Sequence, residues 1–141
     1  MSDEPAASPA LERLRVLNEH LVSPELFYRL LDGLPDALVV VDSTGRVVLF
    51  NSQAELLFGY HRSEVIGREV ETLIPEGARG RHVKHRESFA DAPQARPMGT
   101  GLILAARHKD GREIPVSINL SPIVSTDGQY TSAVIRRKPR E

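Results

Sequence analysis

The stretch 30–67, LLDGLPDALVVVDSTGRVVLFNSQAELLFGYHRSEVIG, determines the fold expected for this chain. Two apolar, β-branched runs at 37–41 and 46–50 flank a turn of Asp, Ser, Thr and Gly, which predicts a β-hairpin. Asn51 follows the second run, and asparagine is a strong helix N-cap, so a helix is predicted to begin there and to end at Gly59. The stretch therefore predicts two antiparallel strands followed by a short helix.

The rest of the chain continues this order. Short helices are predicted at 63–67 and 70–74, and a longer one at 78–90, where apolar residues and histidines share one stripe. A loop is predicted at 91–97. Strand patterns then occupy the C-terminal part, at 101–107, 114–120 and 130–135. Two strands, several short helices and three strands predict an α+β fold, an antiparallel sheet with its helices on one face.

The N-terminal part is predicted to differ from this domain. Residues 1–9 are rich in Ser, Pro, Ala and acid, and we expect a disordered tail. Residues 10–22 repeat Leu at helical spacing and predict an amphipathic helix. The main domain is expected at 23–137, with 138–141 as a tail or a linker to an output domain. A dimer seam through the helix would place Asn18 at a register-setting position; packing of the helix on its own sheet explains the same leucines. The expected dimer residues are Leu11, Leu14, Asn18 and Leu21.

The composition narrows the possible function classes. The chain has 141 residues and a net charge of -1, so nothing favours binding to nucleic acid. Cysteine is absent, which excludes disulfides, cysteine-zinc sites and thiol nucleophiles. The longest apolar run, Ala37 to Val41, is far below the roughly 20 residues of a membrane span. We therefore expect a cytoplasmic protein without a membrane span, and no residue pattern indicates an enzyme.

The quoted stretch resembles the opening of a PAS domain: an apolar strand, Asp-x-x-Gly, a strand ending in Asn, Phe-Gly-Tyr and Glu-Val-Ile-Gly. The later stretch ARHKDGREIPVSINLSPI, at 106–123, resembles the central hairpin of that family. The resemblance implies a five-stranded antiparallel sheet with short helices on one face, here with an extra N-terminal helix. It also implies a non-catalytic sensor or relay module in bacterial signal transduction.

This resemblance implies partners as well as a fold. We expect the regulatory part of a histidine kinase, as in two-component systems, or of a cyclase or a transcription regulator. The expected partners are a second copy, bound through the N-terminal helix and the sheet face, and an output domain or partner protein. PAS domains in signalling kinases often end in Arg-Asp-hydrophobic-Thr, whereas this chain reads Val-Ile-Arg-Arg-Lys-Pro at 134–139. Pro139 disfavours a continuous helix, which favours output through the N-terminal helix.

His82 is the candidate cofactor ligand. In the PAS domains of rhizobial oxygen-sensing kinases, which this segment resembles locally, a histidine on the corresponding helix ligates haem iron. Leu102 stands where those sensors carry the Arg that meets the bound gas. The alternative is a half-buried histidine that packs its helix on the sheet, and we expect no cofactor, with haem as the alternative. His82 and His85 share a helix face, but two ligands are too few for a metal site, and none is expected.

A ligand pocket, if the fold holds one, is expected to have an aliphatic lining, which would suit an apolar or weakly polar metabolite. A packed core without a ligand is the alternative. The positions expected to point into the pocket are Leu38, Val40, Leu57, Ile66, Ile74, His82, Phe89, Leu102, Leu104, Val116 and Ile118.

Overall fold

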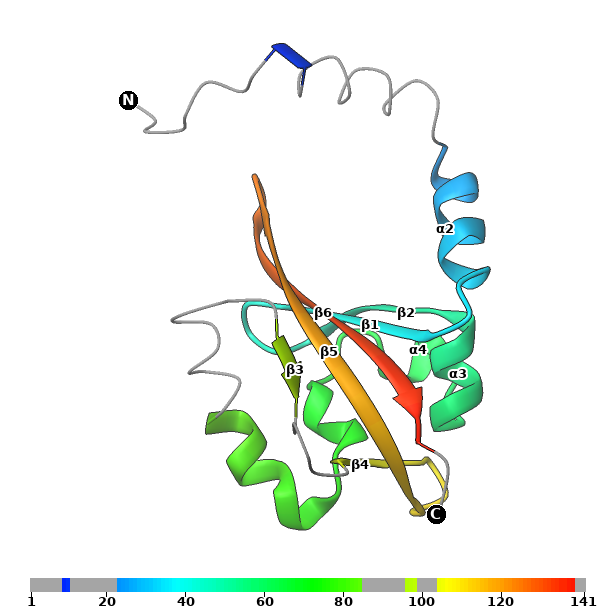
Figure 1. The fold of residues 1–141 in the computed structure, drawn as a ribbon, viewed down its shortest axis with the longest axis vertical. Coiled ribbons are helices and arrows are strands. Elements are labelled where there is room, and N and C mark those ends of the chain that lie inside the picture. The colour runs from blue at the N-terminus through cyan, green and yellow to red at the C-terminus, as the bar shows by residue number, and fades with distance from the viewer. Residues whose placement is uncertain (1–8, 11–22, 85–95, 99–103, 139–141) are drawn as a thin grey trace. The chain divides into compact units, whose positions relative to one another are not determined.

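The structure, a computed structural model, describes residues 9–10, 23–84, 96–98 and 104–138 (Figure 1). The chain divides into two units, residues 1–33 and residues 34–141. In the first unit, helix α2 (Pro24–Asp32) begins where Ser23 Oγ accepts a hydrogen bond from the Leu26 N–H at 3.1 Å. No residue of α2 is buried. The predicted dimer residues Leu11, Leu14, Asn18 and Leu21 lie outside the described residues.

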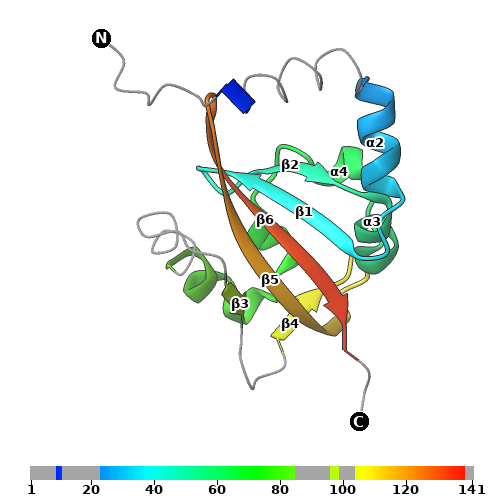
Figure 2. The ribbon, with the colours of Figure 1, turned by 45° about the horizontal axis from the view of Figure 1, so that its top comes forward.

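The second unit is built on an antiparallel sheet. Strands β1 (Ala37–Asp42) and β2 (Val47–Phe50) form the predicted hairpin. Asp42 Oδ1 accepts hydrogen bonds from the Thr44 and Arg46 N–H groups, and Gly45 takes a left-handed φ of 82°, so the turn chemistry read from the sequence is confirmed. The long strands β5 (Glu113–Ser125) and β6 (Gly128–Arg137) form a second hairpin, and β6 also pairs with β1 (Figure 2).

The outer edge of β5 holds two short strands in succession. Strand β3 (Arg96–Met98) pairs with β5 around Asn119, and β4 (Leu104–Arg107) pairs with it around Pro115. The sheet order is β2-β1-β6-β5-β3, and β4 pairs with β5 on the same edge, end to end with β3, so the six strands occupy five positions. The predicted loop at 91–97 is therefore wrong at its end, because residues 96 and 97 already belong to β3.

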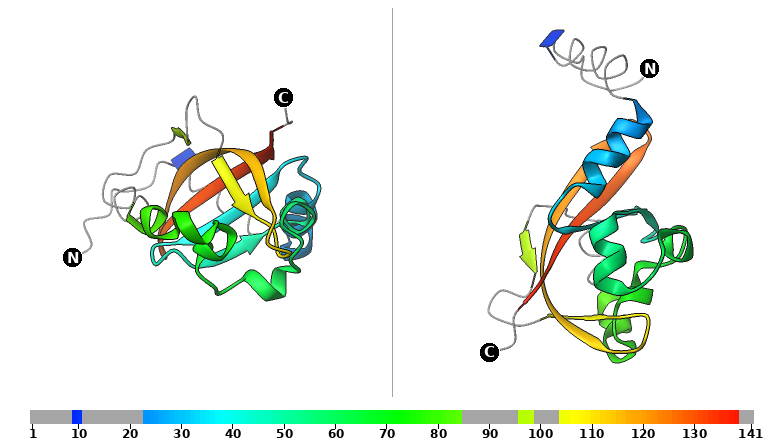
Figure 3. Two further views of the ribbon diagram at one scale, coloured as in Figure 1. Left: turned by 90° about the horizontal axis from the view of Figure 1, so that it is seen from below. Right: turned by 90° about the vertical axis from the view of Figure 1, so that its right-hand side faces the viewer.

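Short helices connect β2 to β3 and lie on one side of the curved sheet (Figure 3). Helix α3 (Ser52–Phe58) is capped by Asn51 and ends at Gly59, whose φ of 78° is left-handed, as the sequence predicts. Helix α4 (Arg62–Val65) and the 3-10 helices η1 (Val70–Leu73) and η2 (Glu76–Ala78) follow, and residues 79–84 are helical. Among the described helices, none combines the length and the apolarity that a bilayer crossing demands.

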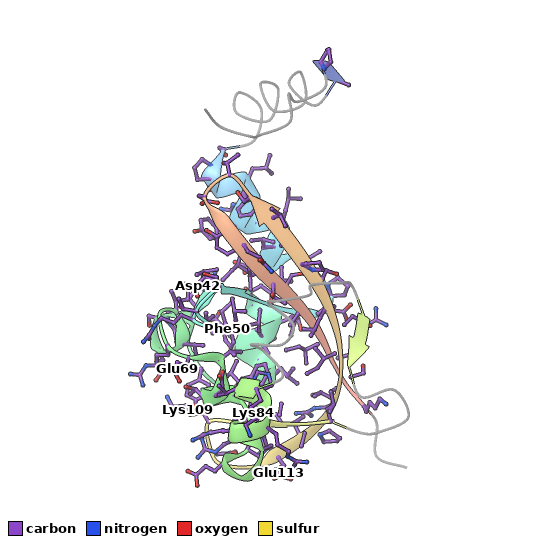
Figure 4. All side chains as sticks on the ribbon, turned by 90° about the vertical axis from the view of Figure 1, so that its left-hand side faces the viewer. Asp42, Phe50, Glu69, Lys84, Lys109 and Glu113 are labelled. Carbon is purple, nitrogen blue, oxygen red and sulfur yellow. The ribbon has the colours of Figure 1, made fainter. Side chains whose placement is uncertain are left out.

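The core lies between the sheet and these helices. Phe50 of β2 points into it, as Figure 4 shows, and its ring centroid lies 5.9 Å from that of Phe58 on α3. In β1 the buried residues are Ala37, Val39 and Val41. The other fully enclosed apolar residues of the core are Val47, Ala54, Val65, Leu73, Ala106, Ile114, Val116 and Ile135.

The prediction that Leu38 and Val40 point into this core is wrong by one residue. Leu38 pairs with Val134, whereas Ala37 pairs with Ile135, which in turn pairs with Ile118. Paired residues share a face, so Leu38 and Val40 lie on the sheet face opposite Ile118. The run 37–41 is apolar at every position, and such a run carries no alternation from which its inward phase can be read.

Candidate functional site

The residue with the greatest chemical interest, His82, faces a buried acid. The His82 side chain is 21% exposed, and its Nδ1 lies 3.7 Å from Oε2 of Glu71, whose side chain is 6% exposed. Glu71 is one of two buried polar or charged residues found in the described part of the chain, and the other is Asn51. A carboxylate is expensive to bury unless polar or charged groups surround it, so its place beside an imidazole indicates a specific arrangement.

The segment that carries Glu71 is tied to the β1–β2 hairpin. The Val70 N–H donates to the Gly45 carbonyl at 2.9 Å, and Arg46 and Glu69 form an isolated antiparallel bridge. Within η1, the Ile74 N–H donates to the carbonyl of Glu71. These bonds fix the backbone from which the buried carboxylate extends.

The helix that carries His82 is fixed at its start by Arg79. The Arg79 Nε donates to the Ile74 carbonyl at 3.0 Å, and its guanidinium lies 3.9 Å from Glu76. The cation thus binds the end of η1 and a carboxylate on η2, and the imidazole follows one turn later along the helix. Glu71 and His82 therefore come from two adjacent segments that Arg79 joins through the Ile74 carbonyl.

The other predicted pocket residues are distributed unevenly. Val116 is fully buried, and Leu104, Ile118 and Ile74 are half-buried. Leu104 pairs directly with Val116, so those two share the core face. Ile66 is 44% exposed, and the prediction that it points inward is wrong: it follows the last residue of α4 in an extended conformation that leaves it in solvent. Phe89 and Leu102 lie outside the described residues, as does His85.

A surface hollow of about 460 Å³ lies elsewhere, between the start of β1, helix α3 and the end of β6. Leu57 lines it, together with Ala37, Gln53 and Ile135, but His82, Leu104, Val116 and Ile118 do not. Arg136 on its rim forms an ion pair with Asp36, with 2.9 Å between Nε and Oδ1. The hollow and the His82 imidazole are thus separate features. The candidate cofactor ligand is His82, which does not line the hollow.

The donor set around His82 suits haem better than a bare metal ion. Throughout the described ranges, no three His, Cys, Asp or Glu side chains gather where they could hold a metal ion. A bare zinc ion needs about four ligands, whereas the porphyrin supplies four nitrogens to its iron and a single imidazole completes the attachment. A histidine that ligates metal also commonly has a carboxylate or carbonyl beside its second ring nitrogen, which is the position of Glu71. One half-buried imidazole backed by a carboxylate fits this requirement.

The sequence and the fold of this chain are similar to those of a known family. The model of the PAS fold matches residues 25–138, a range that includes both hairpins and the helices described between them. The chain belongs to the PAS family. The solved PAS domain of an HTR-like protein from Haloarcula marismortui has the same fold, with a TM-score of 0.66 and 18% identity. That match covers 81% of this chain and 96% of the other.

Two curated relatives of this PAS domain are sensor proteins. The sensor protein FixL of Bradyrhizobium diazoefficiens is 31% identical over 123 residues, and the oxygen sensor protein DosP of Escherichia coli is 31% identical over 111 residues. The matches cover 87% and 79% of this chain. The chain spans only 23% of the length of FixL and 14% of that of DosP.

Glu71 is the site residue that reasoning from the sequence missed. The sequence does hold a signal, because Glu71 is an acid inside the mostly apolar run Val70-Glu71-Thr72-Leu73-Ile74. Charged residues are seldom fully buried without a partner, so an acid within such a run suggests a partner elsewhere in the chain. The partner could not be identified from spacing, since His82 lies eleven positions later, beyond a second short helix.

Proposed function

We propose that this PAS domain binds haem through His82 and serves as the gas- or redox-sensing part of a bacterial signalling protein. The observation that carries the proposal is the half-buried imidazole with its Nδ1 3.7 Å from the enclosed carboxylate of Glu71. The likeness to FixL and to the oxygen sensor DosP supports it. When bound, haem supplies an iron centre that takes up a diatomic gas or changes oxidation state.

The residues of this chain would have three tasks in such a sensor. His82 would ligate the iron, Glu71 would stand behind the imidazole, and aliphatic side chains of β4 and β5 would keep water away. Leu104, Val116 and Ile118 share the face of the sheet that is turned to the helices, which suits them to this last task. The domain itself would catalyse nothing, and an output domain, in a histidine kinase, cyclase or transcription regulator, would respond.

The test is a haem titration of the purified protein. We expect a Soret band with wild type, and a loss of affinity in His82→Ala greater than the roughly 10–100-fold effects of residues that only support a ligand. Added imidazole should restore the band in that variant. His61→Asn is the matched control, because it removes an exposed imidazole and keeps an N-cap acceptor for α4. The absence of a Soret band in wild type, or a band that His82→Ala leaves intact, would reject the proposal.

A second candidate function is a cofactor-free relay that works through dimerisation. The sheet face opposite the helices carries apolar side chains among polar ones: Leu38 and Val134 are paired neighbours on it, both half-buried, and Val134 also pairs with Asn119. In the separate N-terminal unit, Leu26, Phe27 and Leu30 of α2 are 43–59% exposed. Such surfaces suit a second copy of the chain, in keeping with the predicted dimer residues at 11–21. Native mass spectrometry would report dimer and bound ligand together, and a strict monomer at every concentration would remove this candidate.

A further inference from the structure

We propose that Glu71 is the positioning residue for His82: its carboxylate accepts a hydrogen bond from Nδ1–H, which makes Nε2 the nitrogen that ligates iron. This inference rests on the proposed haem site. A neutral imidazole carries its proton on one ring nitrogen or the other, and the group beside it selects which. A carboxylate can only accept at Nδ1, whereas an uncharged amide offers both donors and acceptors.

The distance between the two groups suits this role. Oε2 of Glu71 and Nδ1 of His82 are 3.7 Å apart, and a hydrogen bond to a carboxylate forms at about 2.7–2.9 Å. The difference is about 1 Å, which small rotations of the two flexible side chains can close. No rearrangement of η1 or of the His82 helix is required.

The burial of Glu71 separates it from the other acids of its segment. Glu69, two residues earlier, is exposed on the outer side of the short helices, where Figure 4 labels it. Glu76 is also exposed, and it lies beside Arg79. Only Glu71 of these three is buried. An enclosed carboxylate acts on its neighbour with little screening, so its effect on the imidazole should exceed that of any surface acid.

Of the cations on the neighbouring helix, one is bound to other groups and two are exposed. Arg79 is held by the Ile74 carbonyl and by Glu76, while Arg81 and Lys84 are exposed. The charged group that η1 presents to the imidazole is therefore the carboxylate of Glu71. A negative charge behind the ligand raises its basicity and favours ferric over ferrous iron, which lowers the midpoint potential.

The experiment compares wild type with Glu71→Gln, and uses Glu69→Gln as the control of equal charge change. The full chain is loaded with haem, and two quantities are measured: the rate of ferric haem transfer to apomyoglobin, and the midpoint potential by spectroelectrochemistry. We expect Glu71→Gln to lose haem at least about tenfold faster. A tenfold loss confined to ferric affinity corresponds to a rise of about 59 mV for a one-electron couple. Glu69→Gln should match wild type in both.

Each outcome bears on the inference. If Glu71→Gln matches wild type in both quantities while His82→Ala loses haem, the inference is overturned and the proposed function stands. If His82→Ala keeps its haem, the proposed function fails first. Lower thermal stability with an unchanged potential would make Glu71 a packing residue and would also overturn the inference.

A second variant covers the case in which Glu71→Gln does not fold. Glu71→Leu replaces the buried charge by an apolar side chain, a change that buried sites often tolerate. The inference requires the same rapid haem loss and raised potential in this variant. A wild-type potential in Glu71→Leu would overturn it.

Discussion

Asn51 links the sheet to the first of the helices that follow it, and its replacement should lower the stability of the domain strongly. Its Oδ1 accepts hydrogen bonds from the Ala54 N–H at 3.0 Å and from the Leu38 N–H at 2.9 Å. Its Nδ2 donates to the Asp36 carbonyl at 3.1 Å. One amide therefore caps α3, accepts from the second residue of β1 and donates to the residue that precedes that strand. The side chain is 1% exposed, so water cannot replace these bonds.

The cost of Asn51→Ala follows from these three bonds. Loss of the helix cap alone costs about 1 kcal/mol. The Leu38 N–H and the Asp36 carbonyl lose a partner in a partly buried position, at about 1–3 kcal/mol each. We therefore expect the free energy of unfolding to fall by about 3–7 kcal/mol, a large share of the roughly 5–15 kcal/mol of a typical domain. The melting temperature should fall by more than about 10 °C.

Urea denaturation followed by circular dichroism measures this loss. Asn51→Ser is the informative comparison, because the serine hydroxyl can still cap Ala54 but is too short to bridge to Leu38 and Asp36 as well. It should recover about 1 kcal/mol relative to Asn51→Ala and no more. A loss below about 1 kcal/mol in Asn51→Ala would refute the reasoning, since the cap alone is worth that much. Full recovery in Asn51→Ser would show that the strand and carbonyl bonds contribute nothing.

Two further predictions concern the neighbourhood of α3. Gly59→Ala should destabilise the domain by more than about 1–2 kcal/mol, because φ is 78° and a Cβ would run into the His108 ring. Adding His108→Ala to Gly59→Ala should relieve the clash but not the backbone strain, so it should restore part of the lost stability. A double-mutant cycle that shows no coupling between the two positions would contradict this. Burial raises the pKa of Glu55, but hydrogen bonds from the Arg62 N–H and guanidinium outweigh it, so the pKa lies below its ordinary value. A carboxyl with a lowered pKa in the folded state stabilises the fold above its unfolded pKa, about 4.3, and loses this as the pH falls. Glu55→Gln should therefore flatten the decline of the urea midpoint below about pH 4.3, and an unchanged decline would count against the network.

The sequence predicts local elements well where side-chain chemistry decides them. Asn51, Gly59 and the turn after Asp42 were identified correctly because capping and left-handed φ values depend on the residue itself. The phase of β1 was not predictable, since residues 37–41 are all apolar and the pairing with β6 decides which face is buried. Strand β3 was missed for a similar reason: it is three residues long and exists through its partner β5.

The candidate site was predictable only in part. His82 could be singled out because a histidine on that helix carries meaning within the PAS resemblance. Its neighbour Glu71 could not, because the contact depends on how η1 and the next helix pack, and neither spacing nor periodicity encodes that. Ile66 was predicted to point inward because it is apolar, but it is exposed. It follows the buried Val65 at the point where the chain leaves α4.

The backbone gives the proposed sensor a short route from His82 to the ends of the domain. The loop that leads to η1 is bound to the β1–β2 hairpin by the Gly67 N–H to the Val47 carbonyl and by the Val47 N–H to the Arg68 carbonyl. A displacement of Glu71 would therefore act on the β1–β2 hairpin through backbone hydrogen bonds to Gly45 and Val47. Strand β1 begins beside the end of β6, where Ala37 pairs with Ile135. The chain thus enters and leaves the sheet at one place, so a shift in β1 would reach both connections at once.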